Sequence, residues 1–325
     1  MKNETTYISR VNLEKRIAKE QEIPVVRTIS YSQYSKYFKC PKSWALDKID
    51  KIREASESVD LVFGQAMHTV IQFWLKTIYT NSVKQSNEID LNKMLLTEMQ
   101  KEYLERKTKM NGEHFTTPET LSSYYQDGVE ILNYLKKKRT SYFSTKKTEL
   151  IAIELPLSMQ VHEDYPTIRL TGYIDLVFYN SVSNRYTVID IKTSGRGWNN
   201  YKKKDIFTTD QVLLYKKFLA NILNIDVSQI DVIFFILKRK LNEDVLWPQK
   251  RIQEFSPSSG KVSMNRVTKN LHKFVEECFN FDGSYKTNKV YPATAGLNYR
   301  NCTFCIYDEM PGVCPKEKRI CSSYE

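Results

Sequence analysis

The hydrophobic periodicity of the chain changes near residue 150. Downstream, apolar and polar side chains alternate over short runs, which predicts β-strands. The turn-rich stretch 180–184 predicts that the strands on either side of it form a hairpin. The continuous apolar run 231–237 is typical of a buried central strand. The predicted strands cover residues 149–159, 168–179, 185–192, 231–237 and, at an edge, 247–255.

Apolar residues spaced by three and four predict amphipathic helices, mostly in the first half of the chain. A shorter helix at 30–44 is expected to be capped by Ser30 or Ser32 and interrupted at Pro41. The longer predicted helices cover residues 61–75, 121–135, 210–220 and 262–279.

The order of these elements predicts a mixed α/β fold, with a central sheet flanked by helices. The charged hairpin is expected where this sheet opens to solvent. We expect an N-terminal arm at 1–28, N-terminal helices at 29–75, a helical insertion at 76–148, an α/β core at 149–290 and a cysteine-rich tail at 291–325.

The predicted hairpin carries charges at positions where a buried strand is normally apolar. Asp190 and Lys192 are two residues apart, so both side chains leave the same face of their strand. Asp175 is on the partner strand. Carboxylates supply the hard oxygen ligands that Mg²⁺ and Mn²⁺ prefer, and a nearby lysine can stabilise negative charge on a phosphate. The residues alone leave a cross-strand salt bridge equally open.

Three further residues become informative only beside these charges. His68 is on an apolar-striped helix and can be a Mn²⁺ ligand, although a lone histidine is more often part of the packing. Gln211 and Tyr215 are four residues apart on one helical face. They could contact a phosphate or the Lys192 region, or be an ordinary polar pair at a helix surface.

The charge balance favours an acidic partner. The 49 Lys and Arg residues against 38 Asp and Glu residues give a net charge of +11. Excess positive charge favours polyanions such as nucleic acid. The sequence has no apolar run of about 18 residues and no apolar signal segment at its start, so we expect neither a membrane span nor secretion. We expect a cytoplasmic protein of a bacterial or phage-infected cell.

One basic segment follows the charged strand directly and is a candidate DNA contact. We expect its loop to lie over a DNA backbone, with Trp198 stacking on a base. A solvated basic surface is the simpler alternative. The residues concerned are Arg196, Trp198, Lys202, Lys203 and Lys204.

Cysteines concentrate at the end of the chain. Cys302, Cys305 and Cys314 have a spacing that lets thiolates converge on one metal or cluster. The fourth ligand would be Cys40, far upstream, or Cys321. Structural Zn²⁺ and an iron–sulfur cluster both fit this pattern, and unliganded thiols are a further alternative.

In combination these segments resemble the PD-(D/E)XK nuclease superfamily, in particular its RecB- and AddB-like branch with an iron–sulfur cluster, which includes the small CRISPR-associated nucleases. The resemblance follows the order of motifs through most of the chain. The matching segments are Ser32 to Trp44 with its Cys-Pro, Gly64-x-x-x-His68, Gly172-x-x-Asp175, Asp190-x-Lys192-Thr193, Gln211-x-x-x-Tyr215 and Cys302-x2-Cys305-x8-Cys314.

The resemblance implies a restriction-endonuclease-like core in which the Ile191 carbonyl also binds the metal ion, Lys192 is the catalytic lysine, and the cysteines hold a 4Fe–4S cluster. Glu154 is expected to be structural or to support the ligands. The implied metal ligands are His68, Asp175, Asp190 and Ile191, and the implied cluster ligands are Cys40, Cys302, Cys305 and Cys314.

The function that the resemblance implies is a metal-dependent DNA exonuclease acting from the ends of single-stranded or resected DNA. The alternative is a non-catalytic or partner-dependent DNA-binding module on the same fold. The sequence has no P-loop, which indicates a stand-alone nuclease or the nuclease subunit of an assembly. A helicase or a recombination or annealing protein would then be its partner.

Overall fold

The structure is a computed structural model that describes residues 10–22, 24–52, 57–310 and 312–321. Its centre is a mixed sheet, which has six strands within the described residues. The long strand β3 pairs with β1, β2 and β4, and the order then continues through β5 to β6. The strands are β1 Arg27–Ser30, β2 Thr148–Gln160, β3 Ile168–Asn180, β4 Arg185–Ser194, β5 Ile230–Lys238 and β6 Ile252–Phe255. This architecture confirms the predicted fold class.

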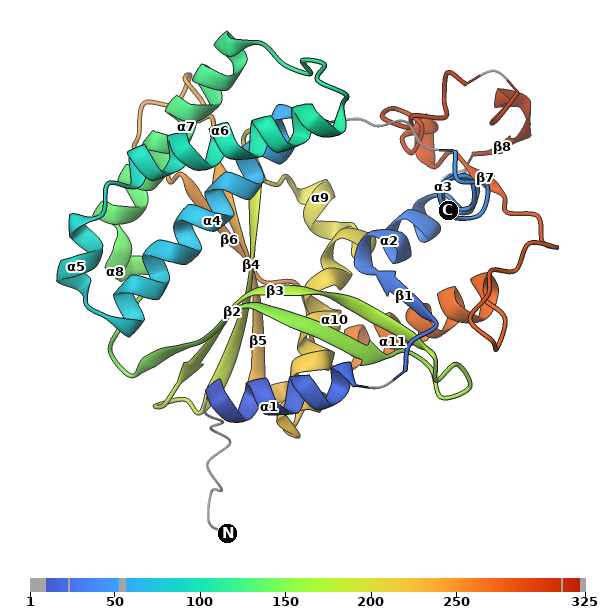
Figure 1. Cartoon of the computed structure of the whole chain (residues 1–325), viewed down its shortest axis with the longest axis horizontal. Helices are drawn as coiled ribbons and strands as arrows, with labels where there is room; N and C mark the ends of the chain where they lie inside the picture. The colour runs from blue at the N-terminus through green and yellow to red at the C-terminus, as the bar shows by residue number, and fades with distance from the viewer. Residues whose placement is uncertain (1–9, 23, 53–56, 311, 322–325) are drawn as a thin grey trace.

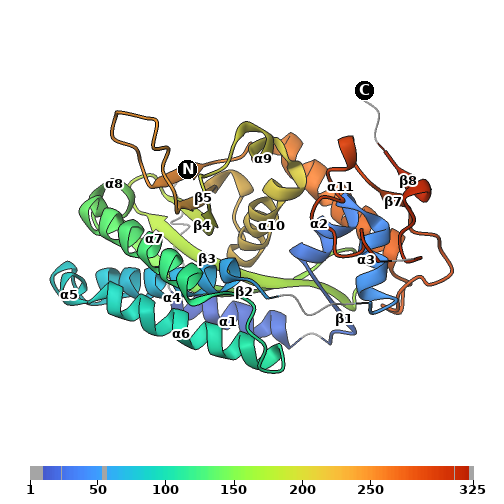
Figure 2. The same ribbon diagram turned by 90° about the horizontal axis from the view of Figure 1, so that it is seen from above.

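Helices cover both faces of the sheet, as Figure 2 shows from above. The face with α4 carries the helices encoded between α3 and β2: α4 Val59–Thr80, α5 Val83–Glu88, α6 Leu91–Lys109, α7 Pro118–Lys137 and α8 Arg139–Tyr142. The other core contains side chains of α1 Arg10–Gln21, α2 Tyr31–Lys39, α3 Pro41–Lys48, α10 Ile206–Leu223 and α11 Lys261–Cys278. Across the described residues, no helix is both long and apolar enough to cross a membrane.

Strand β4 shows why the core separates into two halves. Its side chains alternate: Tyr186 and Val188 are in the core with α10, whereas Ile189 and Ile191 are in the core with α4. Because β4 pairs in parallel with β5 and helices cover both faces, the strand is apolar on both sides. Asp190 therefore enters a face that the rest of the strand fills with apolar side chains.

The tail after α11 lies beside α2 and α3 (Figure 1). Its short strands β7 Ala293–Thr294 and β8 Arg319–Ile320 pair in parallel. The amide of Asn301 donates to the Lys39 carbonyl over 2.6 Å, and Lys42 N donates to the Pro292 carbonyl over 2.9 Å. These bonds join the end of the chain to its N-terminal helices.

Two elements differ from the sequence prediction. Strand β1 was not predicted, because four residues with little apolar pattern give no periodic signal. The edge strand was predicted from residue 247 but begins at Ile252. The preceding segment is a loop closed by Gln249, whose side chain bonds the backbone N and O of Asn242.

Candidate metal and nuclease site

Asp175 and Asp190 lie where two strands separate. The pairing of β3 with β4 extends to the pair Leu176–Ile189. Asp175 and Asp190 are the next positions on each strand, so the register directs both carboxylates to the same face. Beyond the last pair, Ile191 N donates instead to Asp175 Oδ2 over 2.6 Å. The separation of the strands makes room for side-chain chemistry inside a covered sheet.

The two carboxylates are in an unfavourable environment unless a cation joins them. Asp190 is 1% exposed, and Asp175 is also buried. Burial and the negative charge of Asp190 raise the pKa of Asp175 well above the range of an ordinary carboxyl group. A divalent cation between these oxygens would offset this cost.

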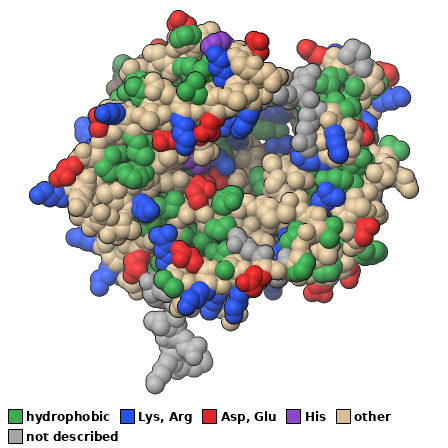
Figure 3. All heavy atoms as spheres, viewed as in Figure 1, with side chains coloured by type: hydrophobic (Ala, Val, Ile, Leu, Met, Phe, Trp, Pro, Cys, Tyr) green, Lys and Arg blue, Asp and Glu red, His purple; other side chains and the backbone are tan. Residues whose placement is uncertain are grey.

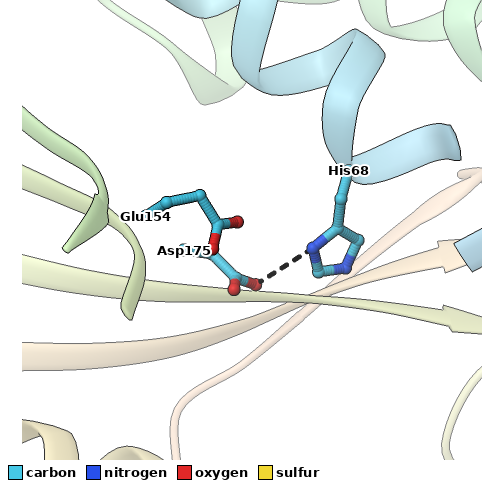
Figure 4. A group of neighbouring side chains, drawn as sticks. All are labelled: His68, Glu154 and Asp175. Atoms are coloured by element: carbon cyan, nitrogen blue, oxygen red, sulfur yellow. Dashed lines mark ion pairs between the residues drawn. The ribbon is translucent and has the colours of Figure 1, made fainter. Parts of the chain in front are cut away.

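His68 reaches the same point from α4 (Figure 4). Its Nε2 is 2.9 Å from the Ile191 carbonyl oxygen, and its Nδ1 is 3.6 Å from Asp175 Oδ2. Burial lowers the pKa of His68, which favours the neutral imidazole at pH 7. If Nε2 donates its proton to the carbonyl, Nδ1 directs a lone pair toward the carboxylate, an arrangement that suits a cation between them.

Glu154, which was expected to be structural or to support the ligands, is itself a ligand candidate in the structure. The pairs Ile153–Leu176 and Leu155–Ile174 place Glu154 opposite Asp175 on β2. One ligand atom each of Glu154, Asp175 and His68 lie within 4.8 Å of one another. Gln72, one turn after His68 on α4, donates a hydrogen bond to Glu154 Oε1. The available signal was a charge inside the apolar run of a strand, the same signal that identified Asp175.

These donors suit a hard divalent ion. Carboxylate and carbonyl oxygens with one imidazole are typical ligands of Mg²⁺ or Mn²⁺. The residues present therefore fit the metal ion that the resemblance implies. The group consists of His68, Glu154 and Asp175, with the carbonyl of Ile191 beside His68 and the carboxylate of Asp190 paired with Lys192.

Lys192 stands on the same face of β4 as Asp190. Its Nζ is 2.8 Å from Asp190 Oδ2. Burial by itself lowers the pKa of Lys192, but the charge and hydrogen bond of Asp190 and the charge of Asp175 together outweigh burial, and the net shift of the pKa is upward. Lys192 is therefore a cation at neutral pH, held beside the Asp190 carboxylate.

Gln211 and Tyr215 meet on α10, as their spacing predicted. Gln211 Nε2 donates to the Tyr215 hydroxyl over 2.8 Å. Burial raises the pKa of Tyr215, and the negative charges of Asp190, Asp175 and Glu154 raise it further. The hydroxyl group is therefore near all three carboxylates and stays protonated, able to donate a hydrogen bond.

The basic segment after β4 is placed differently from the expectation in one respect. Trp198 is only 4% exposed, with its ring 4.7 Å from that of Phe234. Its backbone N donates to Gln253 on β6 over 2.7 Å. The predicted stacking of Trp198 on a base does not fit this burial. The other residues are placed where solvent reaches them at least in part: Arg196 in the loop, and Lys202, Lys203 and Lys204 on α9 Asn200–Lys204.

The four cysteines of the motif come together although Cys40 is far away in sequence. Cys40, Cys302, Cys305 and Cys314 line one small cavity, and Cys321 is exposed and not part of its lining. Cys40 is at the break between α2 and α3, where Pro41 begins the second helix. Four converging thiols are a donor set that suits tetrahedral Zn²⁺ or an iron–sulfur cluster.

Arg319 closes the cysteine cavity from β8. Its side chain is buried, and its guanidinium donates to the Cys314 carbonyl over 2.6 Å and also pairs with Asp308. Burial raises the pKa of Cys302 and the net shift is upward, although the charge of Arg319 acts in the opposite direction. On metal binding this fixed cation would compensate the charge of the thiolate ligands.

Comparisons with known proteins identify the family to which the sequence is similar. A model of the PD-(D/E)XK nuclease superfamily matches residues 28–315. No curated protein matches the sequence. Among solved structures, the chain is similar to SSO0001, with 14% identity over 95% of both chains and a TM-score of 0.35.

A second similar structure is that of a candidate exonuclease from Eubacterium rectale. It is 10% identical, with 82% of this chain and 83% of that chain covered, and a TM-score of 0.42. The family model, by contrast, spans most of the sequence and includes every residue of the candidate metal site. The chain belongs to the PD-(D/E)XK nuclease superfamily.

Proposed function

We propose that this protein is a divalent-metal-dependent DNA exonuclease that hydrolyses phosphodiester bonds from the ends of single-stranded or resected DNA. The observation that carries the proposal is the meeting of Asp175, Asp190 and His68 where β3 and β4 separate, with Lys192 on the same face as Asp190. The net charge of +11 supports a polyanionic substrate.

Each residue of the site has a role in this proposal. His68, Glu154, Asp175, Asp190 and the carbonyl of Ile191 would hold Mg²⁺ or Mn²⁺. The bound ion would polarise the phosphate and lower the pKa of a water molecule. Lys192 stays charged and would stabilise negative charge on the phosphate. Tyr215, oriented by Gln211, would donate a hydrogen bond toward the same oxygens.

We also propose that Cys40, Cys302, Cys305 and Cys314 hold a 4Fe–4S cluster, with structural Zn²⁺ as the alternative. Either centre would join the tail to α2 and α3, in addition to the bonds from Asn301 and Lys42. Closing so long a loop through metal ligation would stabilise the fold.

Two parts of the proposal follow the family resemblance. They are cleavage from DNA ends rather than at internal positions, and the presence of a protein partner. A helicase or a recombination or annealing protein in the cytoplasm would supply free ends to a chain that has no P-loop of its own. The alternative function is a non-catalytic or partner-dependent DNA-binding module. The intact set of Asp175, Asp190 and Lys192 favours the enzyme over this alternative.

The proposal is tested with end-labelled linear and circular DNA, single- and double-stranded, incubated with Mn²⁺, Mg²⁺ or EDTA. We expect metal-dependent loss of linear DNA by wild-type protein, none by Lys192→Ala, and full activity of Lys269→Ala, an exposed lysine on α11. Cutting of circles would replace the exonuclease with an endonuclease. Binding without cleavage in every condition would favour the DNA-binding module.

A further inference from the structure

A cleft separates α2 and α9 from the cysteine-rich tail. Its volume is about 670 Å³, within the range of small-ligand sites. Figure 3 shows a hollow in the surface of the molecule, with Lys and Arg side chains around it. The residues of the cleft that carry the argument are Lys36, Lys39, Tyr201, Asp205, Arg300 and Phe304.

Two aromatic rings in this cleft are open to solvent. Phe304 in the tail is 96% exposed and Tyr201 on α9 is 54% exposed. Aromatic side chains of a folded protein are normally packed, as Trp198 is here. Exposed rings in a basic groove are the stacking platform on which unpaired bases bind. A duplex keeps its base faces stacked internally, so this platform favours a single strand.

Positively charged side chains line the cleft, and one of them joins its two walls. The Arg300 guanidinium of the tail lies 3.2 Å from the centre of the Tyr201 ring on α9, so the opposite walls touch here. Lys39 Nζ is 3.5 Å from Asp205 Oδ2, and Lys36 Nζ is 3.2 Å from Asp47 Oδ2. The charge of Arg300 is therefore the excess positive charge of the lining. The cleft thus keeps a moderate positive charge for phosphates.

Lys202 adds a cation beside the cleft. It is exposed and directly follows Tyr201 on α9, one of the elements that line the cleft. A DNA phosphate at this edge of the cleft would meet its charge.

We infer that the cleft is a binding site for a single-stranded DNA segment, in which a base stacks on Phe304 and the phosphates lie near Arg300 and Lys39. The inference rests on the proposed function and adds a substrate subsite to it. It also gives the cysteine-rich tail a direct role, because the tail supplies one of the two walls. A centre held by the cysteines would keep this wall in place.

The test compares Phe304→Ala with Phe281→Ala, an aromatic residue that is 70% exposed outside the cleft. Binding of a fluorescent oligothymidylate of about 16 nucleotides is measured by anisotropy without divalent ions. We expect Phe304→Ala to weaken binding roughly tenfold, the loss of one stacked base, and Phe281→Ala to leave it unchanged. We expect Arg300→Ala to reduce the salt dependence of binding by roughly 0.7 in logarithmic slope.

A small substrate separates this subsite from the catalytic centre. The p-nitrophenyl ester of thymidine 5′-phosphate has no second base to reach Phe304, so Phe304→Ala should hydrolyse it at the wild-type rate. Equal oligonucleotide binding by Phe304→Ala and wild type would overturn the subsite, even if both cleave DNA. If wild type hydrolyses neither substrate, but Phe304→Ala still binds the oligonucleotide more weakly than wild type does, the subsite stands and the proposed catalysis fails.

Discussion

Glu154 on β2 lies opposite Asp175 on β3, and it does so with a left-handed backbone, at a φ of 48°. A non-glycine residue in this region costs on the order of 1–3 kcal/mol and persists where its surroundings hold it. Here Gln72 donates a hydrogen bond to the Glu154 carboxylate, which lies within 4.8 Å of ligand atoms of His68 and Asp175. The strain thus coincides with the site, as expected of a residue retained for function.

Replacing Glu154 should therefore separate stability from activity. We expect Glu154→Gly to raise the free energy of unfolding by about 1 kcal/mol, because glycine adopts positive φ without strain. Metal-dependent cleavage should fall at least tenfold, since a ligand is lost. Glu154→Gln is the matched control: it keeps the strain, so only activity should fall. Thermal unfolding and cleavage rates, measured on the same protein samples, test both expectations. Full activity of Glu154→Gly would show that Glu154 is not part of the metal site.

Gln72 should act through Glu154 rather than on the substrate. Loss of a group that orients a metal ligand typically lowers metal affinity about 10- to 100-fold. We expect Gln72→Ala to raise the Mn²⁺ concentration for half-maximal cleavage by that order, with the maximal rate nearly restored at high Mn²⁺. Gln65→Ala, exposed on the same helix, is the control. A lower maximal rate at an unchanged Mn²⁺ requirement would contradict this role.

The acid side of the pH profile should depend on the metal concentration. Burial and Asp190 raise the pKa of Asp175, so as the pH falls this carboxyl group takes up a proton earlier than an ordinary one. Protons and metal ions compete for the same oxygens, and more Mn²⁺ should move the acid limb to lower pH. The measurement is kcat/KM against pH at two Mn²⁺ concentrations. An acid limb that does not shift with the Mn²⁺ concentration would show that the protonation of another group causes it.

The cysteine centre should depend on Cys40 and not on Cys321. We expect Cys40→Ser to lose the bound iron or zinc and to lower the melting temperature, because the tail then loses a ligand from the N-terminal helices. Cys321→Ser should match wild type in metal content and stability, since Cys321 does not line the cavity. Elemental analysis and thermal unfolding test both variants. Equal metal loss in the two variants would show that the ligand set is different.

The strand carrying Asp190 and Lys192 could be predicted because its period of two fixes which side chains share a face, and the structure has this alternation. The position of Glu154 could not be predicted, since its closeness to Asp175 depends on the register between β2 and β3, which the sequence does not specify. Burial of Trp198 likewise depends on contacts with Phe234 and Gln253, far along the chain. Local pattern identified the chemistry, and tertiary contacts decided which residues take part.

The most direct test of the metal site is a titration of the purified protein with Mn²⁺, followed by calorimetry or by electron paramagnetic resonance of the free ion. We predict saturable binding to wild type that Asp175→Asn abolishes, because Asp175 is near Glu154 and His68 and its removal takes away a ligand that no neighbour replaces. Thermal unfolding of the same variant confirms that it is folded. Mn²⁺ binding to folded Asp175→Asn with the wild-type affinity would contradict the assignment of this site as the metal centre.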